Sequence, residues 1–417
     1  MKRLQTAFII LWSIALLSGC ASIPDSNSPV ASYKERLESR EKDGLKVSVA
    51  ALGREESIRV FGAPLNDIGI QPIWLEIENQ STVMQWLLPI GIDDNYFPPY
   101  EASRRASNVS SRNERELYAA LSQQAIKYVV RPGEKTTGFV YAHADEGMKA
   151  LNVRLHGETA EHNFHFVVPV PGIPNNYFDP NPATLYSQTP TSLTLPELRE
   201  WIANLPCCAV NAESAPGDPI NMVFVSDLDT LREALISNHW DVTAPISSAS
   251  IRRMISAFIF GSRYRYAPIS PLYFFEREQD IAFQKARSVI DERNHMRLWL
   301  APVSYQGQSV WVGQASRDVG VKFSGRFWPP TTHIIDPDMD DARFYIVQEL
   351  VDTGYAGSFG FVLGHHPAPP ESPHYNAEGD PYFTDGHLVV FFLVKDPVTP
   401  AKIELLNWDL PEGLFER

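Results

Sequence analysis

A proline-dense stretch divides this chain of 417 residues into two regions. Nine prolines fall between positions 169 and 216, namely Pro169, Pro171, Pro174, Pro180, Pro182, Pro190, Pro196, Pro206 and Pro216. Proline has no backbone N–H and interrupts helices and sheet ladders, so this stretch is unsuited to the interior of a domain. We therefore expect a connector at 171–216, with one short helix at 196–205, between domains at 45–170 and 217–396.

Alternation of apolar and polar residues predicts an all-β first domain. In one candidate strand Ile73, Leu75 and Ile77 share a face, and turn residues separate it from its neighbours. The expected strands are 45–52, 71–78, 137–141, 149–155 and 162–168. The pattern is typical of a small immunoglobulin-like sandwich. An insert at 100–127 is helix-like, with Leu117, Leu121 and Ala125 along one face.

The second domain mixes helical and strand periods, which predicts an α+β fold with a mixed or antiparallel sheet. We expect Asp227 to cap a helix through Ser237, and Asp336 to cap a helix through Asp352. A helix or strand is expected at 251–260, and a tail at 397–417. The expected strands are 220–225, 272–275, 296–303, 308–316 and 388–394.

The N-terminus has the composition of a secretory signal. Lys2 and Arg3 precede an apolar run at 7–17, which is too short for a membrane span of about twenty residues. The run ends in Leu17-Ser18-Gly19-Cys20, which resembles a bacterial lipobox. The resemblance implies removal of the signal peptide 1–19, acylation of Cys20 with palmitate-type chains, and a tether at 20–44. Ala21 in place of Asp implies sorting to the outer membrane, on its periplasmic face.

The charge of the chain restricts its partners. Its formal net charge is −14, while 44% of its residues are hydrophobic, enough to build real cores. An acidic chain is unsuited to nucleic acid and to a polybasic membrane contact, so acyl chains at Cys20 would form the membrane attachment. The partners that remain are an envelope protein, a lipid headgroup or a glycan.

Two cysteines are left once Cys20 is acylated, and they are adjacent. Cys207 and Cys208 can be partly buried thiols, a disulfide, or metal ligands. Neighbouring Cα atoms lie about 3.8 Å apart, below the usual disulfide range of about 4.4–6.8 Å. A bridge between them would therefore be strained and easily reduced.

The sequence predicts a hairpin with its turn at Gln306-Gly307. In this register Met296, Leu298 and Leu300 face a core, and the opposite face is polar. The polar pairs are Trp299 with Gln314, Arg297 with Ser316, and His295 with Asp318.

This polar face has two interpretations. In one, Asp318 orients His295 as a general base, Arg297 holds an anion, and Trp299 and Gln314 line the ligand. In the other, the face is a solvated side of an antiparallel sheet with one charge pair. A register error of one residue would remove the pairing of His295 with Asp318.

Acidic residues after His333 suggest a second site. Asp336, Asp338 and Asp340 begin like a calcium loop, but the glycine and the final glutamate of such a loop are missing. Acids in the first turn of a helix are also explained by the helix dipole. If His333 and His295 come together, they and a carboxylate could bind a divalent metal. No other cofactor is expected.

Several stretches of the second domain resemble the LssY C-terminal-like domain family of bacterial envelope proteins. The matching stretches, in order, are Gly217-Asp218-Pro219-Ile220-Asn221, His295-Met296-Arg297-Leu298-Trp299, Trp311-Val312-Gly313, His333-Ile334-Ile335-Asp336-Pro337-Asp338-Met339-Asp340 with Arg343, and Thr384-Asp385-Gly386. In some relatives this domain follows membrane enzymes of the phosphatidic-acid-phosphatase type, which implies lipid-related work in the envelope. The resemblance carries no settled activity.

Two functions fit these observations. The first is an anchored periplasmic module that binds a headgroup, glycan or protein through the face of Arg297 and Trp299. The second is a hydrolase of a phosphate or ester, with His295 as its base and a metal held by His333 with Asp336 or Asp340.

Overall fold

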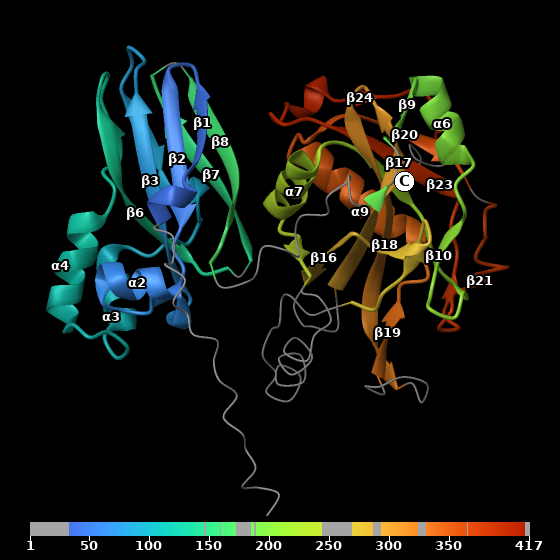
Figure 1. Ribbon diagram of the computed structural model, residues 1–417, viewed down its shortest axis with the longest axis horizontal. Coiled ribbons are helices and arrows are strands. Elements are labelled where there is room, and N and C mark those ends of the chain that lie inside the picture. Colours follow the sequence, from blue (N-terminus) through green and yellow to red (C-terminus); the bar gives the residue numbers. More distant parts are fainter. Residues whose placement is uncertain are drawn as a thin grey trace, which may run out of the picture. The chain divides into compact units, whose positions relative to one another are not determined.

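The first region contains two four-stranded antiparallel sheets that share one apolar core (Figure 1). The first sheet has the order β1 (Glu38–Lys42), β2 (Leu45–Ala51), β3 (Ile70–Asn79), β6 (Lys135–His143). The second has the order β5 (Val129–Val130), β4 (Gln85–Leu88), β7 (Met148–His156), β8 (Glu161–Pro169). The computed structural model describes residues 33–145, 147–158, 160–171, 185–186, 189–243, 269–286, 293–323, 331–364 and 366–412.

Alternation along the strands explains this core. Ile73, Leu75 and Ile77 of β3 are fully buried against Leu151 and Val153 of β7, while the residues between them are partly exposed. All five strands expected from the alternation are present, each within two residues of its predicted ends or extended by up to two residues.

Strand β1 lies in the segment predicted as tether. Asp43 and Gly44 have φ of 53° and 74°, so they form a tight turn that folds β1 back onto β2. The compact part of the chain therefore begins at Glu38 rather than at position 45. The lipobox and the preceding signal lie outside the described residues, as does the expected element at 251–260.

Three helices accompany the first region: α2 (Arg54–Phe61), α3 (Pro99–Ala106) and α4 (Glu114–Gln124). The side chain of Asn113 accepts a hydrogen bond from the Glu116 amide at 3.0 Å and so caps α4. Leu117 and Leu121 are buried as predicted, whereas Ala125 follows the end of the helix.

The second region is built on a large mixed sheet. Its strands run in the order β13 (Asp241–Val242), β16 (Ile281–Ala286), β17 (Arg293–Tyr305), β18 (Gln308–Phe323), β12 (Met222–Val225), β23 (His387–Leu393), β20 (Ala356–Leu363), β24 (Glu404–Leu405). Also, β19 (Thr331–Ile335) pairs with β18 and β9 (Thr191–Leu193) with β17. The pairs β12–β23, β17–β9 and β20–β24 are parallel, so the sheet is mixed, which is one of the two forms that the sequence predicted. Its outer strands β9 and β24 lie beyond the expected 217–396.

Both faces of this sheet are covered (Figure 1). Helices α7 (Leu228–Ser237) and α9 (Met339–Asp352) pack on one face. Helix α6 (Leu195–Ala203) and a small sheet pack on the other. The small sheet has the order β11 (Pro216–Pro219), β10 (Cys208–Val210), β14 (Tyr273–Phe274), β15 (Arg277–Glu278). A separate hairpin joins β21 (His374–Tyr375) and β22 (Pro381–Tyr382).

Of the two helix caps predicted from the sequence, one is confirmed and the other is wrong. Asp227 caps α7, its carboxylate accepting from the Thr230 amide at 2.9 Å. Helix α9 is capped by Asp338, not by Asp336. The Asp336 amide donates to the carbonyl of Arg317, so Asp336 still continues the ladder of β19 along β18 and the helix can begin only after it.

The β17–β18 hairpin turns at Gln306 and Gly307, as predicted, with φ of 48° and 80°. An irregularity between Leu300 and Ser304 then shifts the register by two residues. Arg297 is therefore opposite Gln314, and His295 is opposite Ser316. Because two residues is the period of the pleat, every side chain keeps its predicted face, and Met296, Leu298 and Leu300 lie in the core.

Asn221 connects the strands that flank β18. Strand β12 pairs with β18 as far as Gly313, and β19 pairs with β18 from Asp318 onward. Between them the Asn221 side chain accepts from the Ala315 amide at 2.9 Å and donates to the Ala315 carbonyl at 2.8 Å. The side chain thus takes the place of a strand for one residue.

Candidate functional site

The polar face of the β17–β18 hairpin is buried rather than solvated. Its side chains, together with Asp218 of β11, form a set that we call the polar cluster: Asp218, Arg293, His295, Arg297, Gln314 and Asp318. His295 and Arg297 keep 6% and 7% of their surface exposed, and Gln314 keeps none. The interpretation of this face as a solvated side of the sheet was therefore wrong.

Trp299 does not line the polar cluster as a wall for a ligand. It is fully buried in the apolar core that continues the same face of β17, together with Val312 and Phe274. Its indole N–H donates to the carbonyl of Arg277 at 3.3 Å. The face is therefore divided along its length into an apolar end at Trp299 and a polar end from Arg297 to Arg293.

His295 and Asp318 are brought together, although they are not direct partners in the register. His295 Nε2 lies 3.3 Å from Asp318 Oδ2, and Arg293 Nε lies 3.5 Å from the same oxygen. Arg293 Nη1 also donates to Gln284 Oε1 at 2.7 Å. Burial raises the pKa of Asp318 to about 7, against the opposing effect of the arginines. This carboxyl therefore titrates near neutral pH.

Arg297 has a different surrounding. Its Nη1 donates to Gln314 Oε1 at 2.8 Å, and its Nε and Nη2 donate to the carbonyl of Ser270 at 3.3 and 3.2 Å. The amide of Gln314 in turn donates to Asp218 Oδ2 at 3.3 Å. Asn376 Nδ2 donates to Asp218 Oδ1 at 2.9 Å. Burial raises the pKa of Asp218 and lowers that of Arg297.

A second buried arginine, Arg343, fastens helix α9 to the start of β23. Its two terminal nitrogens donate to the two carboxylate oxygens of Asp385 at 2.8 and 2.7 Å. Asp340 accepts from the Thr384 hydroxyl and the Asp385 amide, each at 2.8 Å. Burial acts to raise the pKa of Asp385, but hydrogen bonds from His387 and Arg343 outweigh it and hold this pKa below its usual range.

This arrangement bears on the predicted metal site. Asp340 is engaged with Thr384 and Asp385, and Asp336 Oδ1 accepts from the Asp338 amide at 3.1 Å. The backbone of His333 is opposite Val321, and that of His295 is opposite Ser316, five residues along β18, or about 16 Å. The backbones of the two histidines therefore lie far apart along the sheet, and a site shared by them stays a prediction. Within the described residues no group of three His, Cys, Asp or Glu side chains is arranged to hold a metal ion.

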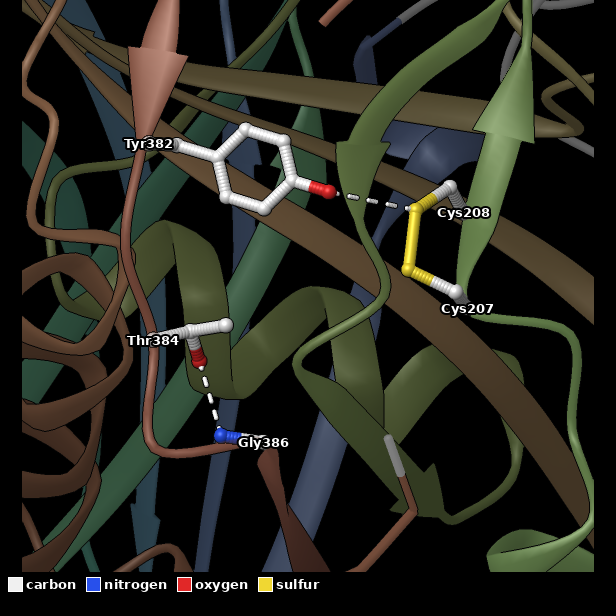
Figure 2. The surroundings of a disulfide bond; sticks show 5 residues. All are labelled: Cys207, Cys208, Tyr382, Thr384 and Gly386. Atoms are coloured by element: carbon white, nitrogen blue, oxygen red, sulfur yellow. Dashed lines mark hydrogen bonds between the residues drawn. A yellow bond between two sulfur atoms is a disulfide. The ribbon is translucent and has the colours of Figure 1, made fainter. Parts of the chain in front are cut away.

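Cys207 and Cys208 form a disulfide at the start of β10 (Figure 2). Cys207 is exposed and Cys208 is half-buried. The hydroxyl of Tyr382 lies 3.6 Å from the sulfur of Cys208, and Figure 2 shows it pointing at that atom. Cys208 is opposite Pro219, the residue after Asp218, so the disulfide lies next to one end of the polar cluster.

Comparison with known protein families finds a match within the second region. Residues 202–388 match the family described as LssY C-terminus. This region is an LssY C-terminal domain. It contains the disulfide, the polar cluster and the contacts of Arg343. In a comparison with curated proteins, none matches the chain.

The structure gives physical roles to several of the stretches on which the resemblance to the LssY C-terminal domain was based. Asp218 belongs to the polar cluster, and Asn221 extends the pairing of β18. Asp340 and Arg343 are held by Thr384 and Asp385, and the Gly386 amide donates to the Thr384 hydroxyl. Most of these residues thus fix the architecture, while His295, Arg297, Asp318 and Asp218 add buried charge that packing alone does not need.

Sequence reasoning missed three members of this site. Arg293 precedes His295 and Arg297 on alternate positions of one strand, so strand periodicity alone could have found it. Asp218 was part of the family stretch but had no assigned role. Asn376 lies in the loop between β21 and β22, where no periodic signal predicts its contact with Asp218.

Proposed function

We propose that this protein is an outer-membrane lipoprotein facing the periplasm, whose LssY C-terminal domain binds an anionic group at the polar cluster. The lipobox at Leu17–Cys20 supports the anchor. In the described part of the chain no helix has the length and apolarity to cross a membrane. We further propose that the first region is an immunoglobulin-like module that acts as a spacer or protein-binding unit.

The observation that carries the binding proposal is the surrounding of Arg297. Within the described residues its hydrogen bonds go to two neutral acceptors, the Gln314 side chain and the Ser270 carbonyl. A guanidinium that is 7% exposed is costly to bury unless an anion compensates it. Arg343, which is fully buried, has a bidentate carboxylate partner. Arg297 is therefore a buried cation with capacity for an external anion.

The neighbouring carboxyl groups strengthen this argument. The pKa of Asp318 is raised to about 7, and burial also raises the pKa of Asp218. A carboxyl with a pKa of about 7 is partly protonated at neutral pH, so Asp318 balances the charge of Arg297 only in part. A planar guanidinium fork suits a phosphate or carboxylate group, as in a lipid headgroup.

Inorganic phosphate is the simplest probe, titrated calorimetrically into the mature chain carrying Cys20→Ala. The sharpest variant is Gln314→Glu, which keeps the size of the side chain but places a carboxylate against Arg297. We expect the internal anion to weaken phosphate binding at least tenfold, and Arg297→Gln to abolish it. Arg131→Gln, at a 69% exposed side chain, is the control and should bind like the wild type.

Two results would contradict the proposal. One is wild-type protein that binds no phosphate at millimolar concentration while it is folded by circular dichroism. The other is a folded Gln314→Glu variant with unchanged affinity, since the anion would then bind elsewhere.

A hydrolase remains the second candidate, because His295 Nε2 lies 3.3 Å from Asp318 Oδ2 beside Arg297. An ionised Asp318 would orient His295 as a base, so turnover of a phosphate ester or an acyl ester should rise as the pH passes about 7. His295→Gln should lower kcat by about 10²-fold or more. Absence of turnover with both p-nitrophenyl phosphate and p-nitrophenyl acetate would leave the binding function alone.

A further inference from the structure

The disulfide between Cys207 and Cys208 contributes little to the stability of the fold. A disulfide stabilises a fold mainly by restricting the unfolded chain, and this effect grows with the length of the loop that it closes. A bridge between neighbours closes the smallest loop that a chain can form. The domain around it already has two extended apolar cores, on the two faces of its sheet, so it does not depend on cross-links.

The two sulfur atoms differ in their surroundings, as Figure 2 shows. Cys207 is exposed and can be reached by a reagent, whereas Cys208 is half-buried. A disulfide sulfur carries no hydrogen, so in the contact of 3.6 Å the Tyr382 hydroxyl is the donor and Cys208 the acceptor. The structure therefore distinguishes an accessible sulfur from one that is held by a hydrogen-bond donor.

We propose that Cys207 and Cys208 form a reversible redox site that exchanges electrons with a dithiol protein or small dithiol. A thiolate of the dithiol attacks Sγ of Cys207, and the bond between the two protein sulfurs breaks. Cys208 leaves as a thiolate, which accepts the hydrogen bond of Tyr382 and then takes a proton.

A second thiolate of the same dithiol completes the exchange. It attacks the sulfur that was joined to Cys207, releases Cys207 as a thiolate that is protonated, and forms a disulfide within the reductant. Two electrons and two protons have then moved to the protein, and the dithiol is oxidised. A disulfide oxidant reverses the reaction, so both states are accessible without further cofactors.

Tyr382 is a positioning residue in this scheme. Exchange is faster when the leaving thiol has a lower pKa, and a hydrogen bond to the departing sulfur stabilises its thiolate. Its position on β22, across from the start of β10, holds the hydroxyl at the sulfur that must leave. Removal of this hydroxyl should slow reduction without removing the disulfide.

The test uses the mature chain with Cys20→Ala, purified without reductant. Native protein is treated with dithiothreitol, and samples taken at intervals are quenched with an alkylating reagent. Mass spectrometry then gives the number of alkylated cysteines per chain. We expect no alkylated cysteine before treatment and two afterwards. Tyr382→Phe should react about tenfold more slowly, the loss of one hydrogen bond to a charged sulfur. Tyr375→Phe, an exposed tyrosine in the same hairpin, should react like the wild type.

Three outcomes would overturn the proposal. Two alkylated cysteines before treatment would show that no disulfide exists. Reduction in urea but not under native conditions would make the bridge inaccessible. An unchanged rate in folded Tyr382→Phe would remove the assistance by the hydroxyl. If that variant does not fold, the wild-type comparison decides, because an assisted site is reduced in the native state at least as fast as in urea.

Discussion

Arg297 and Arg343 show how differently one residue type can be used within one domain. Arg343 lies fully buried with a bidentate carboxylate and a backbone carbonyl as partners, so its charge is balanced within the fold. Arg297 lies almost as deep and donates to an amide oxygen and a carbonyl. The contacts of Arg343 fix helix α9, whereas those of Arg297 leave its positive charge able to attract an anion. The sequence marked both residues but could not distinguish them, because the distinction depends on Asp385 and Ser270, far away in the chain.

Asp318 should make stability depend on pH in an unusual direction. Its carboxyl has a pKa near 7 when folded and near 3.8 when unfolded, so between these values the folded state holds a proton that the unfolded state has lost. Stability therefore falls as the pH rises from about 4 to about 7, by at most about 4 kcal/mol. In Asp318→Asn this dependence of the free energy of unfolding on pH should largely disappear, whether the variant is more or less stable than the wild type.

Urea unfolding at pH 4.5, 5.5, 6.5 and 7.5 measures this slope. Asp352→Asn, at an exposed position at the end of α9, is the comparison and should keep the wild-type slope. Parallel curves for wild type and Asp318→Asn would show that Asp318 is ionised throughout this range.

At the scale of the elements, the β17–β18 hairpin shows where local sequence signals stop. Gln306-Gly307 predicted the turn and the alternation predicted the faces, and both are confirmed. The shift between Leu300 and Ser304 was not predictable, because it depends on neighbours from distant parts of the chain. Strand β9 pairs with β17 at 303–305, while β16 pairs with it before the irregularity. The sequence thus identified His295 and Asp318 as partners, but through a register that does not exist.

Gly313 should be intolerant of any side chain in this hairpin. A Cβ atom there would lie 2.6 Å from Met222 Cγ and 2.9 Å from Leu298 Cδ2, inside the core. We expect Gly313→Ala to lower the free energy of unfolding by about 1–3 kcal/mol through overpacking. Gly320→Ala in the same strand would meet just one atom within 4 Å, Ile334 Cδ1 at 3.7 Å, and should stay within about 0.5 kcal/mol of wild type. Chemical denaturation of the two variants measures the difference, and equal stabilities would contradict this account.

At the scale of the whole molecule, the sequence predicted the sequential arrangement of a β region and an α+β region but not their limits. Strand β1 was hidden in a charged run, because a paired edge strand needs few apolar residues. Strand β20 was missed because it contains two glycines and little alternation. Strands β9 and β24 are short, and they exist only because the large sheet offers edges to pair with.

The proposed anchor makes a prediction for the complete protein in its cell. Cys20→Ala should move the protein from the membrane fraction to the soluble periplasmic fraction and abolish labelling with palmitate, because no acyl chain can attach. Ala21→Asp should stay lipidated but move to the inner membrane, as the lipobox resemblance implies. Fractionation on a density gradient separates these cases, and a Cys20→Ala protein that stays with the outer membrane would refute acylation as its attachment.

Asn221 has a consequence for how this sheet resists exchange and aggregation. A strand edge with free donors and acceptors is a template on which other chains can pair. On one side of β18 the backbone is matched in turn by β12, by the amide of Asn221, and then by Asp336 and β19. A single side chain thus bridges the seam between two strands and leaves no opening there for an invading strand. The amide of Ala315 should accordingly exchange with deuterium as slowly as those of the sheet interior, although its hydrogen-bond partner is a side chain rather than a strand.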